Sequence, residues 1–180
     1  ITFLPEYKRA TQIGRLFQDP LKGTAPSMTI EENLSLAYLR SKRRVASFGI
    51  SARERTYFRE KLSTLGLGLE DRLTTKVGLL SGGQRQALTL MMATLVTPKL
   101  LLLDEHTAAL DPATAEKVLE LTRKIVEENK ITCMMITHNI RSSLELGTRT
   151  LMMDNGQIVL DLAGPQREGM TVPRLLELFK

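Results

Sequence analysis

The chain has 180 residues, of which 42% are hydrophobic and 25% charged, with a net charge of +5 at pH 7. These values are ordinary for a globular domain, and no apolar run reaches the roughly 18 residues that a membrane span needs. Only 4% of the residues are aromatic and none is Trp, so no base-stacking platform for nucleic acid is evident. The single cysteine, Cys133, excludes an internal disulfide and fits a reducing cytosol.

The first half of the chain is predicted to be mainly helical after one short strand. Residues 12–17 read as that strand, and a loop with three breakers, two Pro and one Gly, follows it. The segments Thr29–Glu32 and Ser51–Glu54 are capping-box patterns, in which Ser or Thr and a Glu three residues later bond each other's backbone amides. We expect a helix after each box, and Gly66 and Gly68 to end the second one.

The basic residues gather in two clusters, Arg40-Ser-Lys-Arg-Arg44 and the segment between Arg53 and Lys61. We expect solvated helix faces there, and we leave nucleic acid or anionic lipid open as alternative partners.

The second half is predicted to contain a strand, a helix and a second strand. The run "KLLLLDE" (99–105) is a continuous apolar run ended by charge, as in a strand buried on both faces of a parallel sheet. Asp111-Pro112 starts a helix that ends at Lys130, and "ITCMMIT" (131–137) reads as another buried strand. This order implies a right-handed parallel crossover.

The C-terminal part is predicted to hold a hairpin and a helix. Asn155-Gly156 lies between two apolar runs and is the strongest short signal for a hairpin turn. A last short helix is expected after Pro173, and the sequence shows no internal repeat.

Two carboxylates, Asp104 and Glu105, follow the four leucines at the carboxyl end of the predicted strand. Ligands of open α/β sheets bind at this edge. The first carboxylate can hold Mg²⁺ through water, because this ion keeps several waters. The second can act as general base on an attacking water. Two surface acids at a strand end are the alternative interpretation.

Ser81-Gly82-Gly83-Gln84 allows two interpretations. As a capping box it opens a helix, whereas its two glycines would let an anion approach the amides at a helix start. If the segment is only a cap, Gly83→Asp is expected to be tolerated.

Two further side chains, His138 and Gln18, are candidates by their positions. His138 stands at the end of the strand predicted at residues 131–137, where it can contact a phosphate, although a lone His is more often structural. Gln18 ends the first strand and can reach a metal or its water. His106 stands next to the carboxylates and is assigned no role.

The combination of these features resembles the ATP-binding subunit of ABC transporters, and the resemblance covers essentially the whole chain. Its elements, in order, are Gln18, Leu80-Ser-Gly-Gly-Gln84, Leu100–Leu103 with Asp104-Glu105, Ala108-Ala-Leu-Asp111 and His138. His106, where Pro is common, and Ala108, where Ser is common, depart from the family pattern, and Ala108 is expected to weaken a D-loop hydrogen bond across the dimer.

The resemblance implies a metal and catalytic set. Gln18 is then the Q-loop glutamine, which contacts Mg²⁺ and couples to the membrane partner. Asp104 is the Walker B aspartate that holds Mg²⁺. Glu105 is the catalytic glutamate and His138 the switch histidine.

The resemblance also implies a nucleotide-binding set. Ser81, Gly82, Gly83 and Gln84 form the signature, which contacts the γ-phosphate of ATP held by a second subunit in a head-to-tail dimer. Asp111 ends the D-loop.

The implied fold is α/β, with the parallel sheet core of P-loop NTPases and an inserted helical subdomain. Residues 1–25 and 97–180 would belong to the core, and residues 26–96 to the helical subdomain. No Gly-x-x-x-x-Gly-Lys-Ser/Thr phosphate loop occurs in the sequence. The chain is therefore interpreted as N-terminally truncated and as inactive on its own.

The implied function is ATP hydrolysis that energises an ABC membrane transporter, with transmembrane permease subunits as partners and no nucleic acid. We expect a bacterial importer-like subunit, peripheral at the cytoplasmic face of the cell membrane. An exporter remains open, and so do a soluble ABC-type ATPase acting on nucleic acid or ribosomes and a non-hydrolysing regulatory fragment. The segment between Gln18 and Ser81 lacks the sustained heptads of a DNA-repair coiled coil.

Overall fold

The computed structural model of the chain describes residues 2–40 and 49–178. By their contacts these residues form two units, one up to residue 135 and one from residue 136 onward, and each is described here by itself. Of the basic cluster predicted at residues 40–44, only Arg40 is among the described residues. No described helix is both long and apolar enough to cross a bilayer.

The first unit follows the predicted order of elements, with three short helical segments that the sequence did not indicate: α1, η1 and η2. Its elements are α1 (Glu6–Arg9), β1 (Ile13–Leu16), the 3₁₀ turn η1 (Pro20–Gly23), α2 (Ile30–Leu39), α3 (Ala52–Ser63), the 3₁₀ turn η2 (Val77–Leu79), α4 (Gly82–Thr94), β2 (Leu100–Asp104), α5 (Pro112–Glu128) and β3 (Thr132–Ile136).

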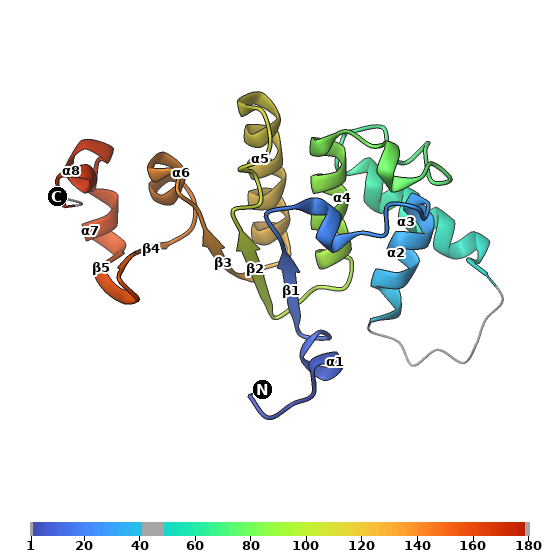
Figure 1. Cartoon of the computed structure of the whole chain (residues 1–180), viewed down its shortest axis with the longest axis horizontal. Coiled ribbons are helices and arrows are strands. Elements are labelled where there is room, and N and C mark those ends of the chain that lie inside the picture. The colour runs from blue at the N-terminus through green and yellow to red at the C-terminus, as the bar shows by residue number, and fades with distance from the viewer. Residues whose placement is uncertain (1, 41–48, 179–180) are drawn as a thin grey trace. The chain divides into compact units, whose positions relative to one another are not determined.

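The strands form a sheet in the order β1-β2-β3, which Figure 1 shows with α5 beside it. β1 and β2 are parallel, and their register pairs Ile13 with Leu100 and Leu16 with Leu103. Because parallel strands end at the same edge, this register brings the residues after Leu16 close to those after Leu103.

The expectation that β2 and β3 are buried on both faces is wrong. In β2, Leu101 and Leu103 are buried, whereas Leu100 and Leu102 are only half-buried. In β3, Met134 is exposed. Side chains alternate between the faces of a strand, and among the described residues α4 and α5 cover one face only, where Leu16, Leu90, Ala93, Leu101, Leu103 and Ile131 form a core.

Cys133 lies on the covered face and is half-buried. Burial raises the pKa of its thiol to about 11, because the charged thiolate loses its solvation. The thiol is therefore neutral and slow to react at physiological pH.

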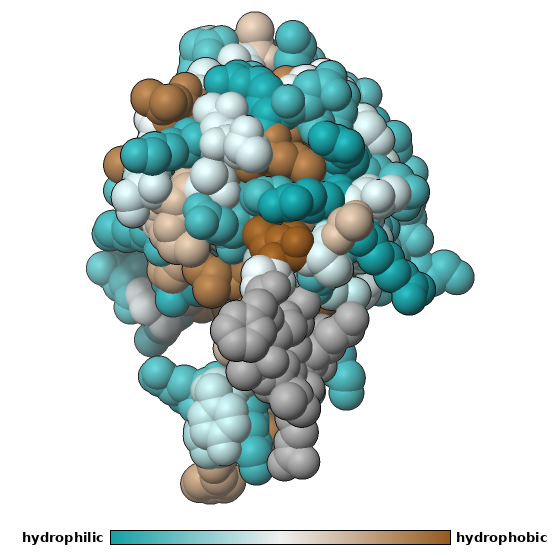
Figure 2. Space-filling model, turned by 90° about the vertical axis from the view of Figure 1, so that its right-hand side faces the viewer, coloured by the Kyte–Doolittle hydropathy of each residue, from teal (hydrophilic) through white to brown (hydrophobic). Residues whose placement is uncertain are grey.

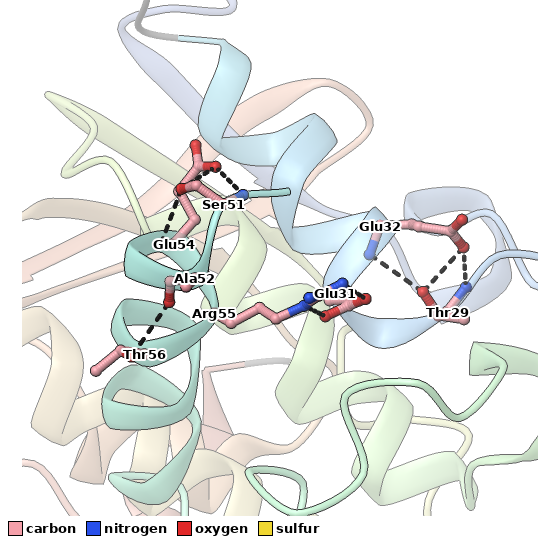
Figure 3. A network of polar contacts seen from close by, with 8 residues as sticks. All are labelled: Thr29, Glu31, Glu32, Ser51, Ala52, Glu54, Arg55 and Thr56. Atoms are coloured by element: carbon pink, nitrogen blue, oxygen red, sulfur yellow. Dashed lines mark hydrogen bonds and ion pairs between the residues drawn. The ribbon is translucent and has the colours of Figure 1, made fainter. Parts of the chain in front are cut away.

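The helices α2, α3 and α4 enclose a second core of the first unit. Both predicted capping boxes, at Thr29 and at Ser51, are confirmed with both of their hydrogen bonds (Figure 3). Each box satisfies helix-start amides that no helical carbonyl can reach. Thirteen buried side chains fill this core: Ile30, Leu34, Phe58, Leu62, Leu65, Leu69, Leu73, Val77, Leu80, Ala87, Leu88, Met91 and Leu95.

An ion pair joins α2 to α3. The Arg55 guanidinium donates from Nε to Glu31 Oε2 over 2.7 Å and from Nη2 to Glu31 Oε1 over 3.0 Å (Figure 3). Glu31 is buried, and this planar two-point contact compensates its carboxylate for lost water. Figure 2 shows hydrophobic residues in separate groups between polar ones on the face that carries α2 and α3.

The second unit contains the predicted hairpin. Asn155 and Gly156 both have positive φ, 46° and 77°, as a two-residue hairpin turn requires. The predicted final helix is present and begins just before Pro173, and α6 and α7 were not predicted. The elements are α6 (Ile140–Glu145), β4 (Arg149–Asp154), β5 (Gln157–Ala163), α7 (Gly164–Glu168) and α8 (Val172–Glu177).

Candidate functional site

The candidate site lies at the edge of the sheet where β1 and β2 end. Asp104 is the last residue of β2, and its Oδ2 is 3.6 Å from Nη2 of Arg15 on β1. Both side chains are about half-exposed, so water screens this pair and it adds little stability. The aspartate carboxylate therefore remains accessible to a ligand.

Glu105 turns the chain away from β2. Its φ is 43°, a left-handed conformation that costs a residue with a side chain on the order of 1–3 kcal/mol. Gln18 Nε2 donates a hydrogen bond of 3.3 Å to Glu105 Oε2. The structure thus brings together two candidate side chains that are 87 positions apart in the sequence, while their roles stay a prediction.

The Gln18 amide presents its carbonyl as well as its nitrogen. Because Nε2 donates to Glu105, Oε1 remains as an acceptor. A carboxylate at Asp104 and an amide oxygen at Gln18 are the hard oxygen donors that Mg²⁺ prefers, and this ion keeps several waters, so few protein donors suffice. No cluster of three or more His, Cys, Asp or Glu occurs among the described residues. The donors present fit a magnesium ion that a substrate phosphate also holds, and they do not fit an all-protein metal cage.

His106 follows Glu105 and is 2% exposed. Its Nε2 lies 3.2 Å from Thr122 Oγ1 on α5. Burial lowers the pKa of the imidazole to about 4, because the imidazolium would lose its solvation. Sequence reasoning assigned this residue no role, and no local pattern connects it to a threonine 16 positions later.

The turn after Glu105 ends at Asp111, which caps α5. Asp111 Oδ1 accepts from the Thr114 amide over 3.1 Å. Hydrogen bonds from Thr114 hold the pKa of the Asp111 carboxyl below its usual range. The turn is therefore fixed at its far end by an ordinary helix cap.

The segment Ser81–Gln84 forms the predicted cap at the start of α4. Ser81 Oγ accepts from the Gln84 amide over 3.2 Å, and Gln84 Oε1 accepts from the Ser81 amide over 3.3 Å. Ser81 and Gly82 are exposed, while Gly83 is buried. The cap is confirmed, and it leaves the exposed end of the segment accessible to a ligand.

Gly83 packs directly against α5, which overturns one expectation. A Cβ added at Gly83 would lie 2.2 Å from Thr114 Cγ2, and one added at Gly82 would lie 3.3 Å from Leu110 Cδ2. Gly83→Asp would therefore disturb folding even if the segment were only a cap. The expectation that Gly83→Asp is tolerated is wrong, because close packing against Thr114 leaves no room for a side chain at this position.

His138 belongs to the second unit and is exposed, two residues beyond the end of β3. Its predicted contact with a phosphate stays a prediction.

Sequence comparisons identify relatives of the chain. A model of the family described as ABC transporter matches residues 4–108. A tyrosine transport ATP-binding protein of Clostridioides difficile is 49% identical over 100% of this chain and 71% of its own length. An ABC transporter ATP-binding protein of Bacillus cereus is 37% identical over 91% of this chain, which spans only 28% of that relative.

Structure comparison agrees with these relatives. An ATP-binding cassette solved as a dimer after hydrolysis, bound to ADP and phosphate, superposes with a TM-score of 0.73 at 28% identity. The match covers 89% of this chain and 68% of the cassette. It confirms the predicted α/β fold with a parallel sheet. The extent of the family match and the identity to the tyrosine transport protein lead to one conclusion: this chain belongs to the ABC transporter family, among its ATP-binding proteins.

Proposed function

We propose that the chain serves in an ATPase subunit that hydrolyses ATP to energise uptake of an amino acid, tyrosine or a close analogue, through a bacterial membrane permease. The relative that matches over the entire chain is named for tyrosine transport, and this supports the substrate class. The subunit would act at the cytoplasmic face of the membrane.

The observation that carries the hydrolytic part is the contact between Gln18 and Glu105 beside Asp104. Glu105 accepts a proton from the attacking water as general base. Asp104 and Gln18 Oε1 would hold Mg²⁺. When bound, Mg²⁺ supplies positive charge against the phosphate oxygens. His138 would contact the terminal phosphate, as the family resemblance implies.

The helix start at Ser81 serves a second subunit. Its exposed residues, Ser81 and Gly82, give a phosphate access to amides at the positive end of α4. In a head-to-tail dimer the partner subunit would present that phosphate. Gln84 keeps the segment in place through its bonds to Ser81, and Asp111 fixes the adjoining turn.

A cavity beside η1 is the proposed contact with the permease. It has a volume of about 130 Å³, and its lining includes Phe17, Arg15 and Arg40. The lining is mixed, with exposed Arg15 beside apolar Leu16 and Met92, and such a lining suits an amphipathic segment with an acidic side chain. Crosslinking from exposed Leu21 and Leu36, with Glu60 on α3 as the control site, is expected to capture the permease. Capture equal to that from Glu60 would favour the soluble alternative.

The isolated chain of 180 residues is expected to bind Mg-ATP weakly or not at all, because it contains no Gly-x-x-x-x-Gly-Lys-Ser/Thr motif. Calorimetric titration of the purified chain measures this directly. Low-micromolar affinity would show that the chain binds Mg-ATP without that motif.

The test of the whole proposal is transport. The complete gene product and its permease, reconstituted in vesicles, are expected to take up labelled tyrosine only with ATP, and unlabelled tyrosine should compete better than other amino acids. Hydrolysis that another amino acid stimulates, with no tyrosine uptake, would reject the substrate. Absence of any hydrolysis would reject the ATPase.

A further inference from the structure

The buried pair of His106 and Thr122 lies outside every role assigned above. Thr122 is 6% exposed, and its Oγ1 hydroxyl donates to the Val118 carbonyl over 2.7 Å. A hydroxyl has one proton, so toward His106 Oγ1 is an acceptor. His106 therefore carries its proton on Nε2 and donates it to Thr122 across 3.2 Å. The Nε2–H tautomer of His106 therefore follows from the bond that Thr122 donates to Val118.

This hydrogen bond attaches the turn to α5 in addition to the helix cap. At the far end, Asp111 caps the helix through the Thr114 amide. At the near end, His106 reaches Thr122, two turns further along the helix. Between them the turn closes on itself, because the Ala108 amide donates to the Glu105 carbonyl over 3.0 Å.

α5 is a rigid base for these attachments. Leu121 and Ile125 pack against the core of buried residues under the sheet, and Val118 is 2% exposed. A bond to Thr122 therefore fixes the turn relative to β2 and β1. Glu105 occupies a left-handed conformation, with φ 43°, which persists only where the surroundings impose it.

We propose that His106 is a positioning residue: its hydrogen bond to Thr122 holds the turn after β2 so that the Glu105 carboxylate stays at the Gln18 amide. The consequence for catalysis rests on the proposed function, while the attachment itself does not. A displacement of about 1 Å at a catalytic group can cost up to about 10² in rate, so loss of one attachment should be visible in turnover.

The matched variants are at Thr122. Thr122→Val keeps the shape and removes the acceptor, whereas Thr122→Ser keeps the acceptor. In the complete gene product, Thr122→Val is expected to lower kcat about tenfold with little change in KM for ATP, in line with a misplaced catalytic group. Thr122→Ser is expected to retain wild-type kcat. Combined with His106→Leu, Thr122→Val should add no further loss, because both remove the same bond.

A readout without turnover tests the attachment in the chain itself. Amide hydrogen exchange of residues 106–110 is expected to rise about tenfold in Thr122→Val and to stay unchanged in α3. Nitrogen NMR of the His106 ring should show the proton on Nε2 in the wild type.

The outcomes separate the two proposals. If the wild type hydrolyses ATP and Thr122→Val keeps the wild-type kcat, the positioning role is overturned. It is also overturned if Thr122→Ser loses as much kcat as Thr122→Val does. Exchange that rises equally throughout the chain also overturns it, because the bond then serves only global stability. If the wild type does not hydrolyse ATP but Thr122→Val shows the local rise in amide exchange, the proposed ATPase is rejected and the attachment of the turn to Thr122 stands.

Discussion

The helix start at Ser81 and the turn after β2 present polar groups at element ends, but different contacts hold them in place. The two bonds of the Ser81 cap join residues three positions apart. In the turn, Glu105 meets a residue 87 positions away and His106 one that is 16 positions away. The cap bonds are encoded within four residues, whereas the turn has its geometry only in the folded chain. The two regions should therefore respond differently to substitution.

The largest effect is expected at the turn, where Glu105→Gln preserves the shape and removes the base. In the complete gene product, turnover should fall by about 10² or more, while ATP binding persists and ATP-bound dimers accumulate. Phosphate release and size-exclusion chromatography with ATP measure these outcomes. Glu116→Gln on α5, an exposed carboxylate with the same change of charge, is the control. Near-normal turnover in Glu105→Gln would mean that another group is the base.

The sequence predicts the local features of this fold well. Capping boxes at Thr29, Ser51 and Ser81, and the turn at Asn155-Gly156, are each encoded within four residues and are present. Their hydrogen bonds need no distant partner. The strands β2 and β3 were also placed correctly, because continuous apolar runs bounded by breakers or charges are typical of strands.

Burial and tertiary contacts could not be predicted in the same way. Leu102 has the same apolar character as buried Leu101 and Leu103, and exposed Met134 has that of half-buried Met135. Only the position of the helices decides which face is covered. The contact of His106 with Thr122 and that of Gly83 with Thr114 join separate elements. Gln18 was predicted as a site residue from the family pattern. Its contact with Glu105 follows from the parallel register of β1 and β2.

The second prediction concerns Gly83, which belongs to the Ser81 helix start but, unlike the cap bonds, also packs against a residue that is distant in the sequence. Gly83→Ala places a Cβ against Thr114 Cγ2 and should lower the free energy of unfolding by about 1–3 kcal/mol, as overpacking does. Thr114→Ser removes that methyl group and keeps the hydroxyl. The double variant should therefore recover most of the stability, measured by urea unfolding. Additive losses in the double variant would show that the two side chains do not meet.

The last prediction uses the two caps as a matched pair. Ser51 and Ser81 are both exposed and both accept from the amide three residues on, over 3.3 and 3.2 Å. Ser51→Ala and Ser81→Ala should each lower the free energy of unfolding by about 1 kcal/mol, because each loses the bond from the amide three residues on. Ser51→Ala also loses the bond that Ser51 Oγ donates to Glu54 Oε2 over 2.8 Å, so its loss should be the larger of the two.

Turnover separates the two serines. The box at Ser51 starts α3, away from any proposed nucleotide contact, so Ser51→Ala should hydrolyse ATP normally at a temperature where it is folded. Ser81→Ala should lose turnover in addition, because the same hydroxyl would face the phosphate held by the partner subunit. Unfolding curves measure the stability of both variants, and phosphate release measures their turnover. Equal turnover in the two variants would leave Ser81 as a cap alone, since a cap contributes to folding and to nothing that hydrolysis measures.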